Sequence, residues 1–180
     1  MAALQDAALN QFTKRGYENV SIASIAKEAG VAVGTVYRFY DNKLFLLRDM
    51  LEGIEAAFVA RMEVDWAAGG SYSERIDRIC EGIFDVALDR SSLLRLFTMT
   101  TDILYEDGSL PGDRIQRQIR RMYQEGMDEG AFRVGDLDMM ASMAHGLVEG
   151  AIMRWMRTGS PANNNAPQEL ASVMKFGFLS

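Results

Sequence analysis

The side chains best suited to chemistry in this sequence lie close together between residues 21 and 43. Hydroxyl groups, a guanidinium and an ammonium are hydrogen-bond donors of the kind that contact phosphate oxygens and base edges in DNA. A glycine among them has no side chain to keep its backbone away from a ligand. The candidate contact residues are Ser21, Val33, Gly34, Thr35, Tyr37, Arg38, Phe39 and Lys43. Together they indicate recognition of a nucleic-acid duplex.

The hydrogen-bond donors among these residues suit different parts of the duplex. Tyr37 and Thr35 have hydroxyl groups for phosphate oxygens, and Thr35 can instead reach a base edge, while Gly34 lets the backbone come close. Lys43 neutralises a phosphate at the start of the next helix. Arg38 is the candidate for reading a base, because a guanidinium bonds two acceptors of guanine at once, a pairing worth about 1–3 kcal/mol of discrimination.

The other candidates have more than one role open to them. Ser21 can cap a helix and contact a phosphate through the same hydroxyl. Val33 offers a methyl contact to thymine. Phe39 fits an exposed contact and local packing equally well, whereas Tyr40 fits the core better than the contact surface.

Three short helices must position these groups. Residues 21–29 have apolar or small side chains at helical spacing, and Gly30 follows where a helix ends most easily in a left-handed conformation. Residues 32–40 restart as a helix with Val36 on its packed face. Residues 2–15 supply a covering helix. This order predicts a helix-turn-helix with one face packed and one face exposed to DNA.

At this point the sequence resembles the TetR family of transcriptional regulators. The matching features are residues 8–16 (ALNQFTKRG), Tyr17, Ser21, Ile25-Ala26, Ala29-Gly30-Val31, Gly34-Thr35, Tyr37 and Lys43. The resemblance implies an all-α fold with a three-helix DNA-binding domain over residues 1–46 and a helical ligand-binding and dimerisation domain over residues 47–180. It also implies a double-stranded operator as partner.

The rest of the chain has the periodicity of helices and few signals for strands. Helices are predicted over residues 44–62, 73–89, 93–104, 114–129, 136–157 and 168–179, with loops at 106–112 and 158–167.

The last two predicted helices resemble the dimerisation surface of the family. Small residues permit close helix approach, and larger apolar ones offer contacts to a second copy. The candidate interface residues are Gly146, Leu147, Gly150, Ala151, Ile152 and Trp155. A two-fold dimer presents two recognition helices to successive major grooves and favours a palindromic operator. The alternative is that these residues pack within one chain.

Twelve methionines and several aromatic residues favour a pliable apolar cavity in the second domain. Its candidate lining is Phe58, Phe84, Phe97, Thr98, Thr101, Met122, Tyr123, Met140 and Met143. The resemblance implies that a small-molecule effector binds such a cavity and changes DNA binding. Ordinary core packing explains each of these residues taken singly.

Composition and charge limit the classes of protein to which this chain can belong. A net charge of −6 and a pI near 4.9 argue against general polyanion binding. Cys80 is the only cysteine and is expected to be buried. No apolar run reaches the ~20 residues of a membrane span, and no secretion signal begins the chain, so a cytoplasmic protein is expected.

The sequence therefore predicts a repressor released from a palindromic operator by a small apolar or aromatic ligand. One alternative is an architectural or interaction protein that binds DNA without an inducer. A small-molecule enzyme is the other, but the only histidine, His145, has no evident catalytic partner. Neither a phosphate-cradling glycine loop nor clustered metal ligands occur in the sequence, so no cofactor or metal is expected.

Overall fold

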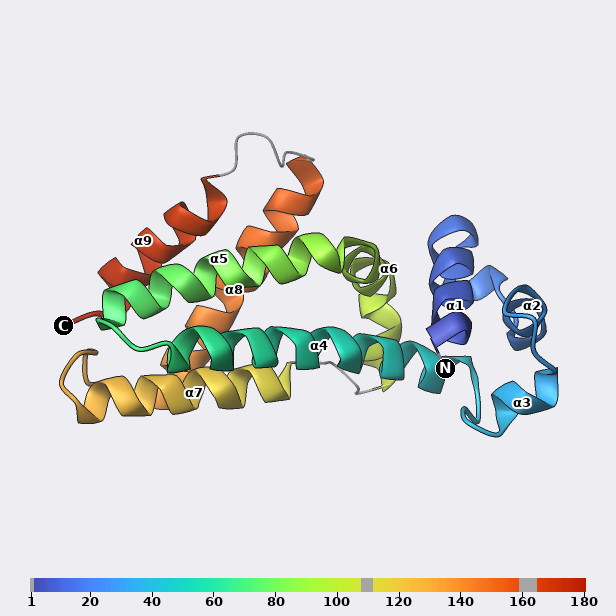
Figure 1. Cartoon of the computed structure of the whole chain (residues 1–180), viewed down its shortest axis with the longest axis horizontal. Coiled ribbons are helices and arrows are strands. Elements are labelled where there is room, and N and C mark those ends of the chain that lie inside the picture. The colour runs from blue at the N-terminus through green and yellow to red at the C-terminus, as the bar shows by residue number, and fades with distance from the viewer. Residues whose placement is uncertain (1, 108–111, 159–164) are drawn as a thin grey trace. The chain divides into compact units, whose positions relative to one another are not determined.

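A computed structural model describes residues 2–107, 112–158 and 165–180, and the described chain is all-α, as predicted. Its contacts form two compact units (Figure 1): Met1–Ile54 with Arg90–Pro111, and Glu55–Asp89 with Gly112–Ser180. Helix α4 (Lys43–Ala67) runs through both units without a break. The predicted division into a DNA-binding domain, 1–46, and a ligand-binding and dimerisation domain, 47–180, therefore remains a prediction.

The first unit is built on α1, which packs against α2 and α6. Its elements are α1 (Ala2–Arg15), the 3-10 helix η1 (Tyr17–Asn19), α2 (Ile22–Glu28), α3 (Val33–Tyr37), the beginning of α4 and α6 (Ser91–Asp107). Fully buried apolar side chains form its core: Ala8, Phe12, Ile25, Val36, Leu46, Leu47, Leu96 and Leu104. The covering helix predicted over residues 2–15 is therefore present as α1 and packs on α2.

Several helix ends differ from the predicted ones. The helix predicted over 32–40 is shorter, because α3 ends at Tyr37 and the amides of Phe39 and Tyr40 both donate to the Val36 carbonyl in a tightened last turn. Helix α4 extends to Ala67, and α6 to Asp107, each past its predicted end. The predicted loop at 106–112 lies partly outside the described residues, as does most of the loop at 158–167.

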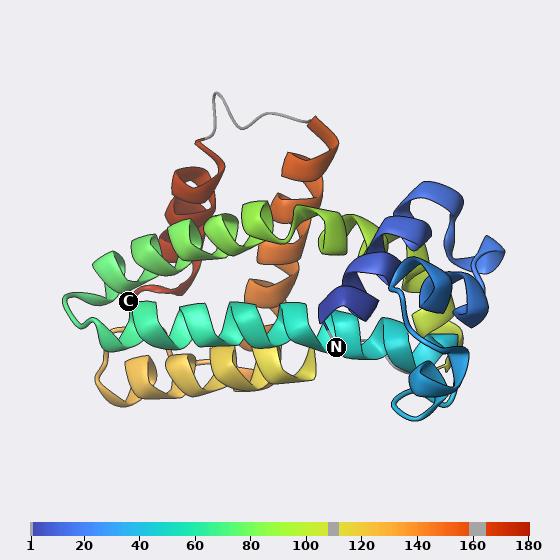
Figure 2. The same ribbon diagram turned by 45° about the vertical axis from the view of Figure 1, so that its right-hand side comes forward.

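The second unit contains the rest of α4 together with α5 (Tyr72–Asp89), α7 (Asp113–Asp128), α8 (Leu137–Thr158) and α9 (Ala166–Phe178). Helix α5 packs on α9, and α7 on α8. The turned view in Figure 2 shows α7 lying along α4. Lys175 Nζ lies 2.6 Å from Asp77 Oδ1 and ties α9 to α5.

Helices α4 and α7 run parallel and are joined near both ends of α7. At its beginning, Glu55 Oε1 accepts hydrogen bonds from the amides of Gly112 (3.1 Å) and Arg114 (2.7 Å). Near its end, Trp66 Nε1 donates to Glu125 Oε2 at 3.0 Å. Buried Glu55 thus supplies the acceptor that the first amides of α7 lack within their own helix.

The end of α7 packs against an aromatic cluster. Phe132 contacts the rings of Tyr123, Tyr72 and Trp66, with centroids 5.0, 5.1 and 6.3 Å away. Gly126 lies directly beneath it, since a β-carbon at that position would be 2.5 Å from Phe132 Cδ2. Glycine is therefore required here for close approach.

Candidate nucleic-acid interface

Ser21 directly precedes helix α2, and its predicted capping role is confirmed. Ser21 Oγ accepts from the Ser24 amide at 3.1 Å, and Ser24 Oγ accepts from the Ser21 amide at 3.3 Å. This reciprocal pair satisfies two amides at the helix start. Sequence reasoning missed Gln11 of α1, whose amide donates to the Ser24 carbonyl at 2.9 Å and to Glu28 Oε2 at 2.7 Å. Gln11 therefore fixes α2 on the covering helix.

The turn between α2 and α3 is formed by Gly30, which has a φ of 69°. The Gly30 amide donates to the Lys27 carbonyl and the Val31 amide to the Ala26 carbonyl, at 3.3 and 3.0 Å. This hydrogen-bond pattern is the Schellman motif that glycine favours. The predicted turn is thus present at the predicted residue.

Helix α3 divides into a packed side and an exposed side. Val36 is fully buried, whereas Tyr37 and Phe39 are each 52% exposed and Val33 is 40% exposed. Thr35 is half-buried, and Ser21, Gly34 and Arg38 are exposed. The structure therefore places most of the predicted contact residues of this segment toward solvent.

Arg38 and Phe39 lie together just after α3. The Arg38 guanidinium carbon is 5.2 Å from the centroid of the Phe39 ring, in a cation–π arrangement. Both of the roles considered for Phe39 are compatible with this geometry. Tyr40, interpreted as a core residue, is buried and donates its hydroxyl to Asp49 Oδ2 at 2.5 Å. Burial and that hydrogen bond raise the pKa of Tyr40 to about 12.

Lys43 has partners within the protein that the sequence did not reveal. Its Nζ donates to the Tyr17 carbonyl at 2.7 Å and lies 4.1 Å from the centroid of the Tyr17 ring. Burial, with a smaller contribution from Glu18, raises the pKa of Tyr17 to about 12. Lys43 therefore fixes the start of α4, and an ammonium has three N–H groups, so phosphate binding remains compatible with this role.

The predicted ligand-pocket residues are divided between the two units. Phe97, Thr98 and Thr101 belong to the first unit, and Phe58, Phe84, Met122, Tyr123, Met140 and Met143 belong to the second. The hydroxyls of both threonines donate to carbonyls of their own helix. Thr98 is exposed and Met143 is 54% exposed, so neither lies in the core as a cavity lining requires. The buried members pack into the core of the second unit.

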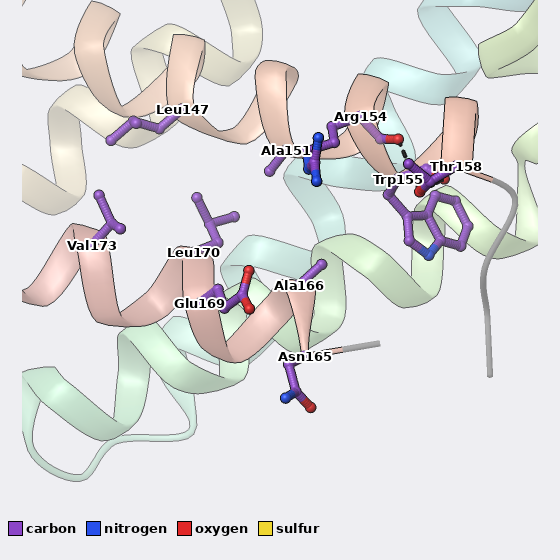
Figure 3. Close-up of a pocket in the computed structure, with 10 residues that line it drawn as sticks. All are labelled: Leu147, Ala151, Arg154, Trp155, Thr158, Asn165, Ala166, Glu169, Leu170 and Val173. Carbon is purple, nitrogen blue, oxygen red and sulfur yellow. Dashed lines mark hydrogen bonds between the residues drawn. The ribbon is translucent and has the colours of Figure 1, made fainter. Parts of the chain in front are cut away.

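A groove between α8 and α9 forms a pocket in the second unit (Figure 3), with a volume of about 370 Å³. None of the predicted pocket residues line it. Its lining is Leu147, Ala151, Arg154, Trp155, Thr158, Asn165, Ala166, Glu169, Leu170 and Val173. Three of the predicted dimer residues, Leu147, Ala151 and Trp155, are in this set.

The other predicted dimer residues differ in exposure. Gly146 and Gly150 are exposed, as is Leu147 at 36%. Ile152, in contrast, is only 5% exposed and packs within its own chain. Its assignment to an interface with a second copy is therefore corrected to a core position.

The described residues contain no group of three or more potential metal ligands. Cys80 is buried beside Met174, with 3.7 Å between their sulfur atoms, and burial raises the pKa of its thiol to about 12. Such a thiol is chemically inert at neutral pH. Within the described ranges, no helix is long and apolar enough to cross a membrane.

Comparison with known proteins finds that this chain is similar to bacterial DNA-binding regulators. Residues 4–50 match the family described as "Bacterial regulatory proteins, tetR family". The nucleoid occlusion factor SlmA of Haemophilus influenzae is 29% identical over 85% of this chain and 73% of that protein. The HTH-type transcriptional repressor KstR of Mycolicibacterium smegmatis is 32% identical over 69% of this chain and 61% of that protein.

A solved structure has the same fold. It is a TetR family transcription regulator from Marinobacter aquaeolei, with a TM-score of 0.74 and 16% sequence identity. The match covers 99% of this chain and 95% of that one. At that identity the likeness concerns the fold alone.

Proposed function

The chain belongs to the TetR family of transcriptional regulators, and on that premise we propose that it is a repressor that binds a palindromic operator as a homodimer and is released by a small apolar or aromatic ligand. The family consists of DNA-binding regulators and not of enzymes. One observation carries the proposal: fully buried Val36 anchors α3, and Tyr37 of α3 and Arg38 directly after it are both exposed.

In this proposal α3 enters the major groove. Arg38 reads guanine through two hydrogen bonds, Tyr37 donates to a phosphate oxygen, and Thr35 contacts a phosphate or a base edge. Gly34 is exposed and leaves room for the sugar-phosphate backbone to approach. These donors lie within two helical turns, so they address a few neighbouring base pairs.

The flanking residues fix the position of α3 on the duplex. Ser21 is exposed at the first turn of α2, where its hydroxyl and the free amides of that turn suit a phosphate. Lys43 adds a charge at the start of α4. Val33 meets a thymine methyl group, and Phe39 supports the Arg38 guanidinium from one side.

The homodimer is proposed to form through α8 and α9. Gly146 and Gly150 leave the backbone of α8 open to a second helix, and Leu147 and Trp155 offer apolar surface beside them. Because an isologous dimer has a two-fold axis, its two copies of α3 would reach half-sites about 34 Å apart. A protein acting on an operator is expected in the cytoplasm.

The effector is proposed to bind in the second unit. Phe58, Phe84, Met122 and Tyr123 are buried there, and Met140 is half-buried. Methionine side chains adapt to irregular apolar ligands. Binding would act by favouring one of two states of α4, which connects this unit to the DNA-binding residues.

A DNA-binding protein without an inducer is the second candidate. Two observations favour this candidate. The buried side chains of Phe58, Phe84, Met122 and Tyr123 help to fill the core of the second unit. The similar protein SlmA is named a nucleoid occlusion factor and not a repressor. A ligand that changes operator affinity would exclude this candidate.

The proposal is tested by measuring affinity for a selected operator and for its single-base variants by fluorescence anisotropy. Arg38→Ala should lose about 5- to 150-fold on the operator, equivalent to about 1–3 kcal/mol, and should no longer distinguish guanine at one position of each half-site. Unchanged discrimination by Arg38→Ala would remove the base-reading role. An operator bound by one chain per duplex would contradict the dimer.

A further inference from the structure

Helix α7 has an exposed side rich in arginine that the proposed function does not use. Its buried side consists of Gln118, Ile119, Met122, Tyr123 and Gly126. Its exposed side carries Arg114, Arg117, Arg120 and Arg121. The chain as a whole has a net charge of −6, so this local excess of positive charge runs against the composition.

Only one of these arginines is paired within the described residues. Arg120 donates to Asp138 Oδ1 of α8 at 2.6 Å. The side chains of Arg114, Arg117 and Arg121 have no ion pair or hydrogen bond to a described residue. These three, here called the arginine stripe, are spaced i, i+3 and i+7, so they lie on one side of the helix and span about 10 Å along its axis.

The helix that carries the stripe is fixed at both ends. Glu55 accepts from the first amides of α7, including that of Arg114. Near the other end, Glu125 accepts from Trp66 Nε1 at 3.0 Å and from Arg75 Nη1 at 3.3 Å. The backbone positions of the stripe are therefore set before any partner arrives, which lowers the entropy lost on binding.

We propose that the arginine stripe is a docking surface for an acidic peptide segment of another protein, with carboxylates at i, i+3 and i+7 of a helix. Guanidinium groups bond carboxylates through two parallel hydrogen bonds, and three at this spacing match one side of an acidic helix. The stripe is a feature of the second unit alone and does not depend on operator binding.

Charge at the borders of the stripe favours a short peptide over a nucleic acid. Asp113 precedes it and Asp128 follows it, and both are exposed. A DNA duplex carries a charge every ~1.7 Å and extends beyond the stripe, so its phosphates would meet these carboxylates. A peptide that covers two helical turns meets the arginines and avoids both ends.

The test uses the full chain and a fluorescein-labelled, alanine-rich helical peptide with glutamates at i, i+3 and i+7, together with the same peptide carrying glutamines. The stripe variant is Arg114→Gln, Arg117→Gln and Arg121→Gln. The control variant, Lys14→Gln, Arg95→Gln and Arg157→Gln, changes the net charge equally at exposed positions. Anisotropy is measured in about 50 mM salt, because screening weakens exposed ion pairs. Far-UV circular dichroism verifies that each variant is folded.

The expected result is binding of the glutamate peptide to the wild-type chain, a loss of about tenfold or more in the stripe variant and of less than about twofold in the control variant. The glutamine peptide should not bind. Equal losses in both variants, or no binding to the wild-type chain, would overturn the proposal. A random-sequence duplex that loses affinity for the stripe variant in a Tyr37→Ala background would reassign the stripe to nucleic acid.

Discussion

Glu55 is the residue whose removal has the most direct structural consequence. The residue is 6% exposed, and its Oε1 accepts hydrogen bonds from the amides of Gly112, Arg114 and Ile115 at 3.1, 2.7 and 3.4 Å. These amides belong to the start of α7 and have no carbonyl partner in their own helix. Glu55→Ala deletes their shared acceptor, whereas Glu55→Gln keeps an oxygen but removes the negative charge.

The magnitude follows from the number and type of these bonds. A hydrogen bond to a charged group contributes about 1.5–3 kcal/mol, and a carboxylate at a helix start about 0.3–1 kcal/mol more. The 3.4 Å contact is long and adds little. Because the two shorter bonds share the single oxygen Oε1, we count them as one such interaction and expect Glu55→Ala to lower the free energy of unfolding by about 2–4 kcal/mol. Glu55→Gln should lower it by about 1–2 kcal/mol, because a neutral acceptor keeps part of the interaction.

Urea denaturation followed by circular dichroism measures these differences, at one protein concentration because oligomerisation shifts the midpoint. Glu63→Gln is the control, since Glu63 is an exposed carboxylate in the same unit and on the same helix. Its effect should stay within about 0.5 kcal/mol. Were Glu55→Ala to behave like the control, the assignment of Glu55 as the cap of α7 would be wrong.

Three further changes test other contacts. Gly126→Ala should cost about 1–3 kcal/mol of stability in the same assay, because a β-carbon there collides with an aromatic ring; a neutral effect would contradict the close packing. Lys43→Met should lower stability by about 1–2 kcal/mol through its lost contacts with Tyr17, whereas exposed Lys27→Met should not. Tyr40 has a folded pKa of about 12 against an ordinary value of 10.0, so its stabilising contribution is complete below about pH 10 and is lost as the pH rises to 12. The free energy of unfolding of Tyr40→Phe should therefore fall less between about pH 9 and pH 12 than that of the wild type. Parallel losses in the two proteins would refute this.

The helix-turn-helix was predictable because local chemistry determines it. Ser21 was expected as a cap and Gly30 as the turn, and both are confirmed by hydrogen bonds between residues no more than five apart. The buried position of Val36 followed from the same spacing. Such features depend on near neighbours in the sequence, which a periodic pattern describes well.

Contacts between distant parts of the chain were not predictable from such patterns. Glu55 gave no signal of its role, because its partners follow about sixty residues later. Lys43 was interpreted by its place in the motif, and its bonds to Tyr17 depend on how two elements pack. Ile152 fitted an interface by apolar type alone, and only the packing of α8 shows that its own chain buries it.

The central claim is sequence-specific binding of DNA by α3. Selection of bound duplexes from a random pool at moderate salt tests it most directly, with Tyr37→Ala as the control variant. The account predicts enrichment of a palindrome by the wild-type chain and no retention of that palindrome by Tyr37→Ala. Enrichment of no common sequence, or equal enrichment by Tyr37→Ala, would contradict it.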